Sequence, residues 1–361
     1  MPVPLHTALM RAAALGAALL LGGCGNLGYY AHLAGGEYHL LSKREAIAEI
    51  LKNPKTDPVL KARLAKVLDA RAYASQTLHL PDNRSYTLYA DVGRPFVVWN
   101  VFAAPELSLQ PVQQCFLLVG CLAYRGYFDV DDARAEAARL KAEGNDVFVA
   151  GIPAYSTLGW FNDPVINTMM RWSDEQLIAT VFHELAHQEY YLNGDTAFDE
   201  SFANFVGEEG LRQYLAARGG ASDAEMLRRE REQIFVKLLM DTRERLDAIY
   251  SDDIPDSEKR ARKQAEFQRL RDEYTQLREG PWKDFPAYDG WFAGAMNNAK
   301  LLPFGLYNRW VPAFAELYRQ QGNDWIAFYK AVKKLGELPD EERERRLTEL
   351  LATAKPSQER R

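Results

Sequence analysis

The sequence predicts an α+β fold in which a mixed β-sheet precedes a central helix, and a mainly helical C-terminal lobe with a long helical hairpin follows. Segments rich in Val, Phe, Tyr and Trp lie between residues 85 and 155, bounded by Gly, Pro and Asn, and they indicate strands. An amphipathic pattern after them indicates the central helix. Over residues 222–280, charged residues alternate with apolar ones at helical spacing, which indicates the hairpin.

Residues 1–24 are predicted to be an export signal. Arg11 supplies a positive charge, and the apolar run from Ala12 to Leu21 is too short for a transmembrane span. The segment ends in Leu21-Gly22-Gly23-Cys24, which resembles a bacterial lipobox and implies cleavage before Cys24 and a diacylglycerol on its sulfur. Gly25, where an Asp would indicate the inner membrane, favours the outer membrane facing the periplasm. A secreted protein with an incidental cysteine is the alternative.

The rest of the chain is long enough for a large core. Three regions are expected: an N-terminal helical segment over 25–84, a sheet with the central helix over 85–220, and a helical C-terminal lobe over 221–361. The net charge of −6 and the mixed charges of the hairpin give no reason to expect nucleic acid as a partner. A plain solvated hairpin is the simplest interpretation of residues 222–280, and the alternatives are that it docks a protein partner or limits access to a cleft.

Four strands and one helix are expected before the central helix. The helix covers Arg134 to Glu143 and ends at Gly144. The predicted strands are Tyr86–Ala90, Phe96–Phe102, Phe116–Ala123 and Asp146–Ile152. Cys115 and Cys121 lie at the third strand. An oxidising periplasm would permit a disulfide between them, and two buried thiols are the alternative.

The central helix is predicted to run from Asp174 to Leu192. Ser173 and Gln176 form a capping box, with a hydroxyl first and a glutamine three residues later. The acids in the first turn are favoured there by the helix dipole. Asn193-Gly194 then provides a stop.

The segment His183-Glu184-Leu185-Ala186-His187 on this helix has the spacing of a zinc site. The two histidines are four residues apart and therefore lie on one helix face, where both imidazoles can bind one zinc ion. Glu184 can take a proton from a water on that ion. For so short a pattern, a buried histidine pair or a solvated face is the alternative. Two uncompensated histidines and a glutamate would, however, be costly on an otherwise apolar helix.

The third metal ligand is expected to be Glu200. The chain has six histidines and none follows His187, so no downstream histidine can complete the site. A second helix beginning near Asp195 would form an antiparallel hairpin with the central helix and would bring Glu200 back towards the histidines. Two histidines, one carboxylate and a position left for water make a catalytic zinc site, with one ion per chain. Glu208 or Glu209 in place of Glu200 is the alternative.

These residues resemble the gluzincin metallopeptidases. His183-Glu184-Leu185-Ala186-His187-Gln188 matches their zinc helix, and Asp199-Glu200-Ser201-Phe202-Ala203 is similar to the segment that carries the third ligand in alanyl aminopeptidases. The mature chain also resembles a family of bacterial lipoproteins described as putative aminopeptidases. Besides the zinc segment, the stretches that carry this resemblance are Gly28-Tyr29-Tyr30, Tyr124-Arg125-Gly126-Tyr127-Phe128, Ala154-Tyr155-Ser156-Thr157-Leu158-Gly159-Trp160-Phe161 and Asn297-Asn298-Ala299.

The resemblance implies a zinc-dependent peptidase, in particular an aminopeptidase, whose mixed sheet packs on the zinc helix and whose substrate is a peptide or protein. Residues Ala154–Phe161 are expected to form a wall of the cleft. Trp160 and Phe161 there either bind substrate side chains or are buried in the core. Gluzincins stabilise the oxyanion with a tyrosine or histidine of the C-terminal lobe, which suggests Tyr307 and, second, Tyr288. A core tyrosine is the alternative for either.

Two features depart from the alanyl aminopeptidases. The interval between His187 and Glu200 is shorter, and the Gly-x-Met-Glu-Asn segment that grips a substrate amino terminus is absent upstream of His183. An endopeptidase of the same class is therefore an alternative. Asn204, four residues after Glu200, is expected to accept a hydrogen bond from a zinc histidine, as an Asp does at that offset in some gluzincins. A helix-packing asparagine is the alternative.

A second hypothesis comes from a different class of protein. The chain would be a non-catalytic envelope lipoprotein whose scaffold is stabilised by zinc and which binds partners through the charged hairpin. Removal of a scaffold metal should cost much of the folding stability, whereas removal of a catalytic metal can leave the fold largely intact.

Overall fold

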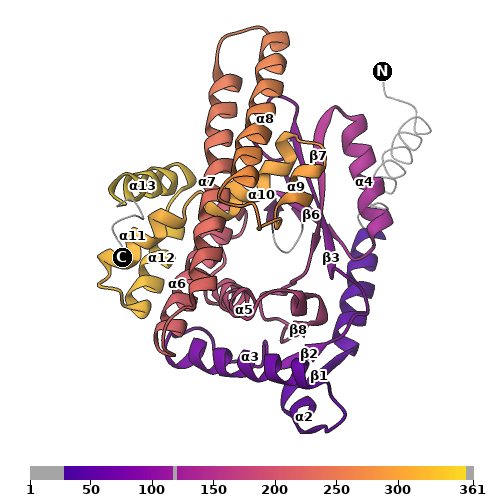
Figure 1. The fold of residues 1–361 in the computed structure, drawn as a ribbon, viewed down its shortest axis with the longest axis vertical. Helices are drawn as coiled ribbons and strands as arrows, with labels where there is room; N and C mark the ends of the chain where they lie inside the picture. Colours follow the sequence, from indigo (N-terminus) through magenta and orange to yellow (C-terminus); the bar gives the residue numbers. More distant parts are fainter. Residues whose placement is uncertain (1–27, 117–119, 355–361) are drawn as a thin grey trace, which may run out of the picture.

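The computed structural model describes residues 28–116 and 120–354, and it confirms the α+β class (Figure 1). Helices dominate the C-terminal half, and the described strands form three small sheets in the N-terminal half. The export signal and Cys24 lie outside the described residues. Within residues 28–116 and 120–354, no helix combines the length and the apolar character needed to cross a membrane.

The N-terminal segment lies along the bottom and right of Figure 1. Its elements are a helix over 28–42, β1 (Arg44–Ala46), α2 (Ile47–Lys52) and α3 (Pro58–Gln76). Asp57 caps α3 by accepting the Leu60 amide at 2.8 Å. β1 pairs antiparallel with β2 (Leu88–Ala90), and β2 pairs parallel with β8 (Val165–Ile166). This sheet ties the N-terminal segment to the chain just before the histidine-bearing helix.

A three-stranded antiparallel sheet forms the second layer. Its order is β6 (Tyr124–Tyr127), β3 (Val98–Pro105), β7 (Asn145–Ile152). Successive side chains of β3 alternate between two clusters, as a strand requires. Val101 and Ala103 pack in the cluster that includes α4 (Val130–Ala142), whereas Phe102 and Ala104 pack in the cluster that includes α10 (Asn298–Asn308). The sheet therefore lies between helices from distant parts of the chain.

The single strand predicted over Phe116–Ala123 is wrong. The chain instead forms a hairpin of β4 (Gln114–Phe116) and β5 (Gly120–Leu122), and β6 follows directly. Gly120, the first residue of β5, has φ +71°, a left-handed conformation that glycine adopts without strain. Cys115 and Cys121 face each other across this hairpin and are joined by a disulfide.

The histidine-bearing helix, α5 (Asp174–Glu189), follows a short 3₁₀ segment, η1 (Asn167–Arg171), and forms an antiparallel hairpin with α6 (Thr196–Ala216). Ser173 accepts the Gln176 amide at 3.2 Å, and the Ser173 amide donates to the Gln176 side chain at 3.3 Å, as the capping box predicts. α5 ends three residues before the predicted Leu192, because the backbone of Tyr190 is extended.

Gly207 of α6 permits the close approach of the two helices. A Cβ at this position would lie 2.8 Å from the Ala179 carbonyl oxygen and 3.3 Å from the His183 Cβ. α5 packs mainly on α6 and α3, whereas the sheet β6-β3-β7 packs mainly on α4 and α10. The sheet and α5 therefore face each other across a space, which is the cavity described below.

Helices continue from residue 223 to residue 353. They are α7 (Asp223–Ser251), α8 (Asp256–Glu279), α9 (Asp289–Ala293), α10, α11 (Val311–Gln320), α12 (Trp325–Gly336) and α13 (Asp340–Thr353). α7 and α8 form the predicted hairpin, which projects at the top of Figure 1. An aromatic cluster that includes Phe235 and Trp282 fills the base of this hairpin. α11 and α12 pack in the main core with α3, α5 and α6.

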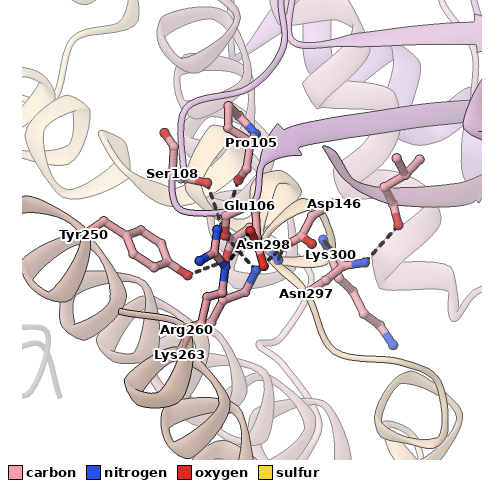
Figure 2. Close-up of polar contacts among 11 residues, drawn as sticks. Pro105, Glu106, Ser108, Asp146, Tyr250, Arg260, Lys263, Asn297, Asn298 and Lys300 are labelled. Atoms are coloured by element: carbon pink, nitrogen blue, oxygen red, sulfur yellow. Dashed lines mark hydrogen bonds and ion pairs between the residues drawn. The ribbon is translucent and has the colours of Figure 1, made fainter. Parts of the chain in front are cut away.

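Asn298 connects the hairpin, the sheet and α10 (Figure 2). Its Nδ2 donates to three backbone carbonyls at the end of β3, those of Pro105, Glu106 and Ser108. Its Oδ1 accepts from the Tyr250 hydroxyl of α7 at 2.7 Å, and its backbone amide donates to Asp146 Oδ2 at 2.9 Å. Lys263 of α8 binds the same Asp146 oxygen at 2.6 Å. The start of α10 is thereby fixed to the sheet and to both helices of the hairpin.

Candidate metal centre

α5 and α6 bring His183, His187 and Glu200 together. The two Nε2 atoms lie 3.2 Å apart, and Glu200 Oε2 lies 3.3 Å from the Nε2 of His183 and 3.5 Å from that of His187. In a tetrahedral zinc site with ligands at about 2.0–2.1 Å, neighbouring ligand atoms are about 3.3–3.4 Å apart. The three atoms therefore form a triangle of the size that zinc requires. Among the described residues, this is the one group of His, Cys, Asp or Glu side chains that could hold a metal ion.

His187 and Glu200 are buried, and each shifts the pKa of the other. Burial acts to raise the pKa of Glu200, but the imidazoles of His183 and His187 outweigh it and lower that pKa to about 2. Burial acts to lower the pKa of His187, whereas the Glu200 carboxylate raises it to about 9. Glu200 Oε2 is buried and has no hydrogen-bond partner of ordinary geometry in the described part of the chain. A buried carboxylate oxygen without such a partner is suited to be a metal ligand.

Glu184 lies beside the triad on α5 and lines the same cavity. Burial raises the pKa of its carboxyl, and the charges of His183 and His187 act against that rise. A carboxylate whose pKa is shifted towards neutrality is suited to accept a proton and then return it. The position and the electrostatics of Glu184 therefore fit a general base.

Tyr307, near the C-terminal end of α10, lies against His183. Their ring centroids are 5.9 Å apart, and the ring planes are inclined by 24°. Burial raises the pKa of Tyr307 well above its ordinary range, and the negative charge of Glu200 adds to this effect. The hydroxyl is therefore protonated at neutral pH and can donate a hydrogen bond into the metal centre.

Two side chains of α6 hold this end of α10. The Ser201 hydroxyl donates to the Leu306 carbonyl at 3.0 Å, and the Asn204 side-chain amide donates to the Tyr307 carbonyl at 3.1 Å. The contact that the structure gives Asn204 is thus with the backbone of Tyr307. Its predicted acceptance of a hydrogen bond from a zinc histidine stays a prediction.

The other predicted candidates lie further from the triad. Glu208 lines the cavity next to the start of α7, where burial and the charge of Glu232 raise its pKa to about 7 and the charge of Arg229 acts against that rise. Glu209 is paired with Arg212, with a shortest distance of 2.6 Å. Tyr288 stacks in the aromatic cluster of the hairpin and is not part of the cavity wall. Of the three possible carboxylate ligands, only Glu200 forms a metal-binding group with the two histidines.

Two further tyrosines were not singled out as site residues. Tyr124 of β6 and Tyr191 after α5 line the cavity, and burial raises the pKa of each hydroxyl above its ordinary range. Tyr124 lies in a stretch that carries the family resemblance, and this is the sequence feature from which it could have been identified. For Tyr191, the only sequence feature that could have identified it is its position, four residues after His187.

Asp163 fixes the segment 154–161 to α5. It is buried, and it accepts the Thr157 amide at 3.0 Å, the Thr157 hydroxyl at 2.5 Å and the Gln188 side-chain amide at 3.4 Å. The segment lines the cavity, as expected for a cleft wall. Trp160 is 70% exposed and Phe161 is 47% exposed, so the alternative that they belong to the core is wrong.

A cavity of about 1420 Å³ is lined by the triad, Glu184, Tyr307 and the segment that carries Trp160. Its walls are α5 and α6, the strands β3 and β6, the segment 152–161 and the helix over 28–42, with the start of α7 at one side. A cavity of this size can hold several residues of an extended peptide. The triad, Glu184 and Tyr307 share its wall.

Comparison with known proteins identifies the family. Residues 28–347 match the family described as Putative aminopeptidase, and this range includes the triad, Glu184 and Tyr307. No curated protein and no solved structure matches the chain. Because the match covers most of the sequence, the chain belongs to the Putative aminopeptidase family.

Proposed function

We propose that this protein is a zinc-dependent peptidase, and that it acts as an aminopeptidase. The observation that carries the proposal is the triangle formed by His183 Nε2, His187 Nε2 and Glu200 Oε2, whose edges are 3.2, 3.3 and 3.5 Å. This triangle fits the tetrahedral geometry of zinc, and two histidines with one carboxylate are a ligand set of catalytic zinc sites. The family membership supports the peptidase class.

His183, His187 and Glu200 would hold one zinc ion. When bound, zinc lowers the pKa of a water ligand from ~15.7 towards ~7 and polarises a carbonyl oxygen. Glu184 accepts the proton of the attacking water and then passes it to the leaving amine. Tyr307 donates a hydrogen bond to the oxygen on which negative charge develops. The loop held by Asp163 and the strands opposite α5 confine the peptide to the cavity.

The location of the protein is part of the same proposal. Leu21-Gly22-Gly23-Cys24 supports a lipid anchor on Cys24, and an exported chain is consistent with the disulfide between Cys115 and Cys121. The peptidase would then act in the bacterial cell envelope, attached to the outer membrane and facing the periplasm. Globomycin treatment of expressing cells tests this, since it should leave the signal uncleaved, whereas release of soluble protein would contradict it.

The test of activity combines metal content with peptide hydrolysis. Purified protein is assayed for bound zinc and incubated with matched free-amine and N-blocked peptides, and products are read by mass spectrometry. We expect one zinc per chain and stepwise loss of residues from free-amine peptides only. Glu184→Gln should retain zinc and lose at least ~100-fold in rate. Internal cleavage of blocked peptides would make the enzyme an endopeptidase, and full activity of Glu184→Gln would contradict the role of Glu184.

Chelation separates the enzyme from a zinc-stabilised scaffold. The main core cluster and the cluster of the hairpin are built from apolar side chains outside the triad, so a metal-free chain should stay folded. We expect a chelator to abolish hydrolysis, to lower the melting temperature only modestly, and to leave the circular dichroism spectrum unchanged. Loss of cooperative unfolding after chelation, without any hydrolysis before it, would favour the scaffold.

A further inference from the structure

Glu37 is a carboxylate in the cavity wall that the proposed hydrolysis does not use. It lies on the helix over 28–42, which tertiary contacts fix against the sheet. The Tyr29 hydroxyl donates to the Gly126 carbonyl at 2.9 Å, and the Phe128 amide donates to His32 Nε2 at 2.9 Å. Glu37 is therefore held at a defined place in the cavity rather than on a free helix end.

The carboxylate of Glu37 has the Tyr155 hydroxyl near it but no cationic partner in hydrogen-bond contact. Both of its oxygens are buried, and neither makes a hydrogen bond of ordinary geometry within the described residues. Burial, and then the negative charge of Asp163, raise the pKa of Glu37 to about 7, while the nearby Tyr155 hydroxyl and Arg44 act to lower it. A buried carboxylate whose two oxygens are not fully hydrogen-bonded costs free energy. Folding alone does not account for its presence here.

The neighbouring charged groups are engaged elsewhere. The Arg44 guanidinium donates to the carbonyls of Leu41, Phe161 and Asn162. Asp163 uses its oxygens to hold Thr157 and Gln188. Glu37 is not part of a three-ligand metal group, since the triad is the one such group in the described part of the chain. What the carboxylate lacks is a cation with hydrogen-bond donors.

We propose that Glu37 is the anionic member of a subsite that binds a cationic group of the peptide substrate. Its carboxylate accepts the ammonium of a free amino terminus or the charged end of a basic side chain, while the peptide extends along the cavity to the metal triad. Tyr155 lies beside the carboxylate. The ring of Phe128 packs edge-on against the ring of Tyr155, with the two centroids 5.3 Å apart. Aromatic rings next to a carboxylate favour ammonium and guanidinium groups. This inference rests on the proposed peptidase function and specifies its substrate.

The test uses three peptide sets of equal length. One is N-acetylated and has no basic residue, the second is N-acetylated with one lysine, and the third has a free amino terminus and no basic residue. We expect Glu37→Gln to lower kcat/KM by about 10-fold or more for at least one of the cationic sets, because a hydrogen bond to a charged group is lost. The kcat/KM of the neutral set should not change. Glu37→Asp keeps the charge and should retain part of the activity. Glu45→Gln, at an exposed position on β1 outside the cavity, is the matched control.

The pattern of loss identifies the source of the cation. A loss confined to the free-amine set assigns the subsite to the substrate amino terminus, and a loss in the lysine set assigns it to a basic side chain. An equal effect of Glu37→Gln on all three sets, or no effect on any, would overturn the proposal.

A binding experiment separates this inference from the peptidase proposal. The same peptides are titrated by calorimetry into Glu184→Gln protein and into the Glu184→Gln, Glu37→Gln double variant, so that no hydrolysis is needed. If the wild type cleaves no peptide, the proposed function fails, yet weaker binding of cationic peptides to the double variant still supports the subsite. Equal affinities of both proteins for the cationic sets, or no binding of those sets, would refute the subsite whether or not peptides are cleaved.

Discussion

The ring of Tyr307 stacks on the ring of His183, with centroids 5.9 Å apart. The two residues are far apart in the sequence, with His183 on α5 and Tyr307 on α10. α10 is held at its start by the network around Asn298 and at its end by Ser201 and Asn204 of α6. The position of the Tyr307 ring against His183 therefore depends on contacts at both ends of α10.

Tyr307→Phe should lower kcat by about 100-fold, the cost of losing one donor to a developing oxyanion. The stacked ring is kept, so the zinc content and the melting temperature should stay near the wild-type values. Steady-state kinetics and metal analysis check this. Tyr288→Phe removes a hydroxyl outside the cavity and serves as the control. Unchanged kcat in Tyr307→Phe would assign this tyrosine to packing alone.

Glu200→Gln should weaken zinc binding by at least ~100-fold, since loss of a group that merely orients a ligand already costs 10–100-fold. Glu208→Gln, two turns further along α6 and also in the cavity wall, should leave zinc affinity unchanged. Competition with a chromogenic chelator measures both affinities. The opposite ranking would make Glu208 the third ligand.

Asn298→Ala should reduce the free energy of unfolding by about 2–4 kcal/mol, because it leaves the Tyr250 hydroxyl and three backbone carbonyls in the core without their hydrogen bonds. Urea denaturation measures the difference. Asn308→Ala, on the same helix, removes only a bond to the Phe304 carbonyl and should cost about 1 kcal/mol or less. Equal costs for the two variants would show that the network contributes little.

Glu37→Gln should change how stability depends on pH. The folded-state pKa of Glu37 is about 7, above its ordinary value of 4.5, so its contribution is fully present below pH 4.5 and is lost as the pH rises through 7. Glutamine does not titrate, and the variant should therefore gain about 1–2 kcal/mol over the wild type between pH 5 and pH 8, less than the full shift because the side chain is partly exposed. Asp163, Tyr155 and Arg44 face Glu37 and are present in both proteins.

Urea denaturation at a series of pH values tests this prediction. Glu45→Gln is again the control, because Glu45 is exposed. A pH-independent difference between Glu37→Gln and the wild type would mean that the carboxylate is not destabilised by burial.

Local sequence rules predicted the centre of the site well and its surroundings poorly. Ser173 and Gln176 cap α5 as expected, and Asp195 caps α6 by accepting the Phe198 amide at 3.0 Å. Those caps set the helical phase that directs the histidines and Glu200 towards each other. The single strand expected over Phe116–Ala123 was wrong, because its apolar residues fit a continuous strand, whereas Phe116 and Gly120 pair with each other across two antiparallel strands.

The sequence by itself determined the helix, its two histidines on one face, and the return of Glu200, because capping and helical periodicity act between residues a few positions apart. Only the tertiary structure decided that Tyr307 meets His183, that Asp163 ties the segment 154–161 to Gln188, and that Glu37 is buried in the same cavity. These pairs are far apart in the sequence, and no local rule links them. Their proximity results from the combined packing of the sheet, the helical hairpin and the core, where many small contact energies add together.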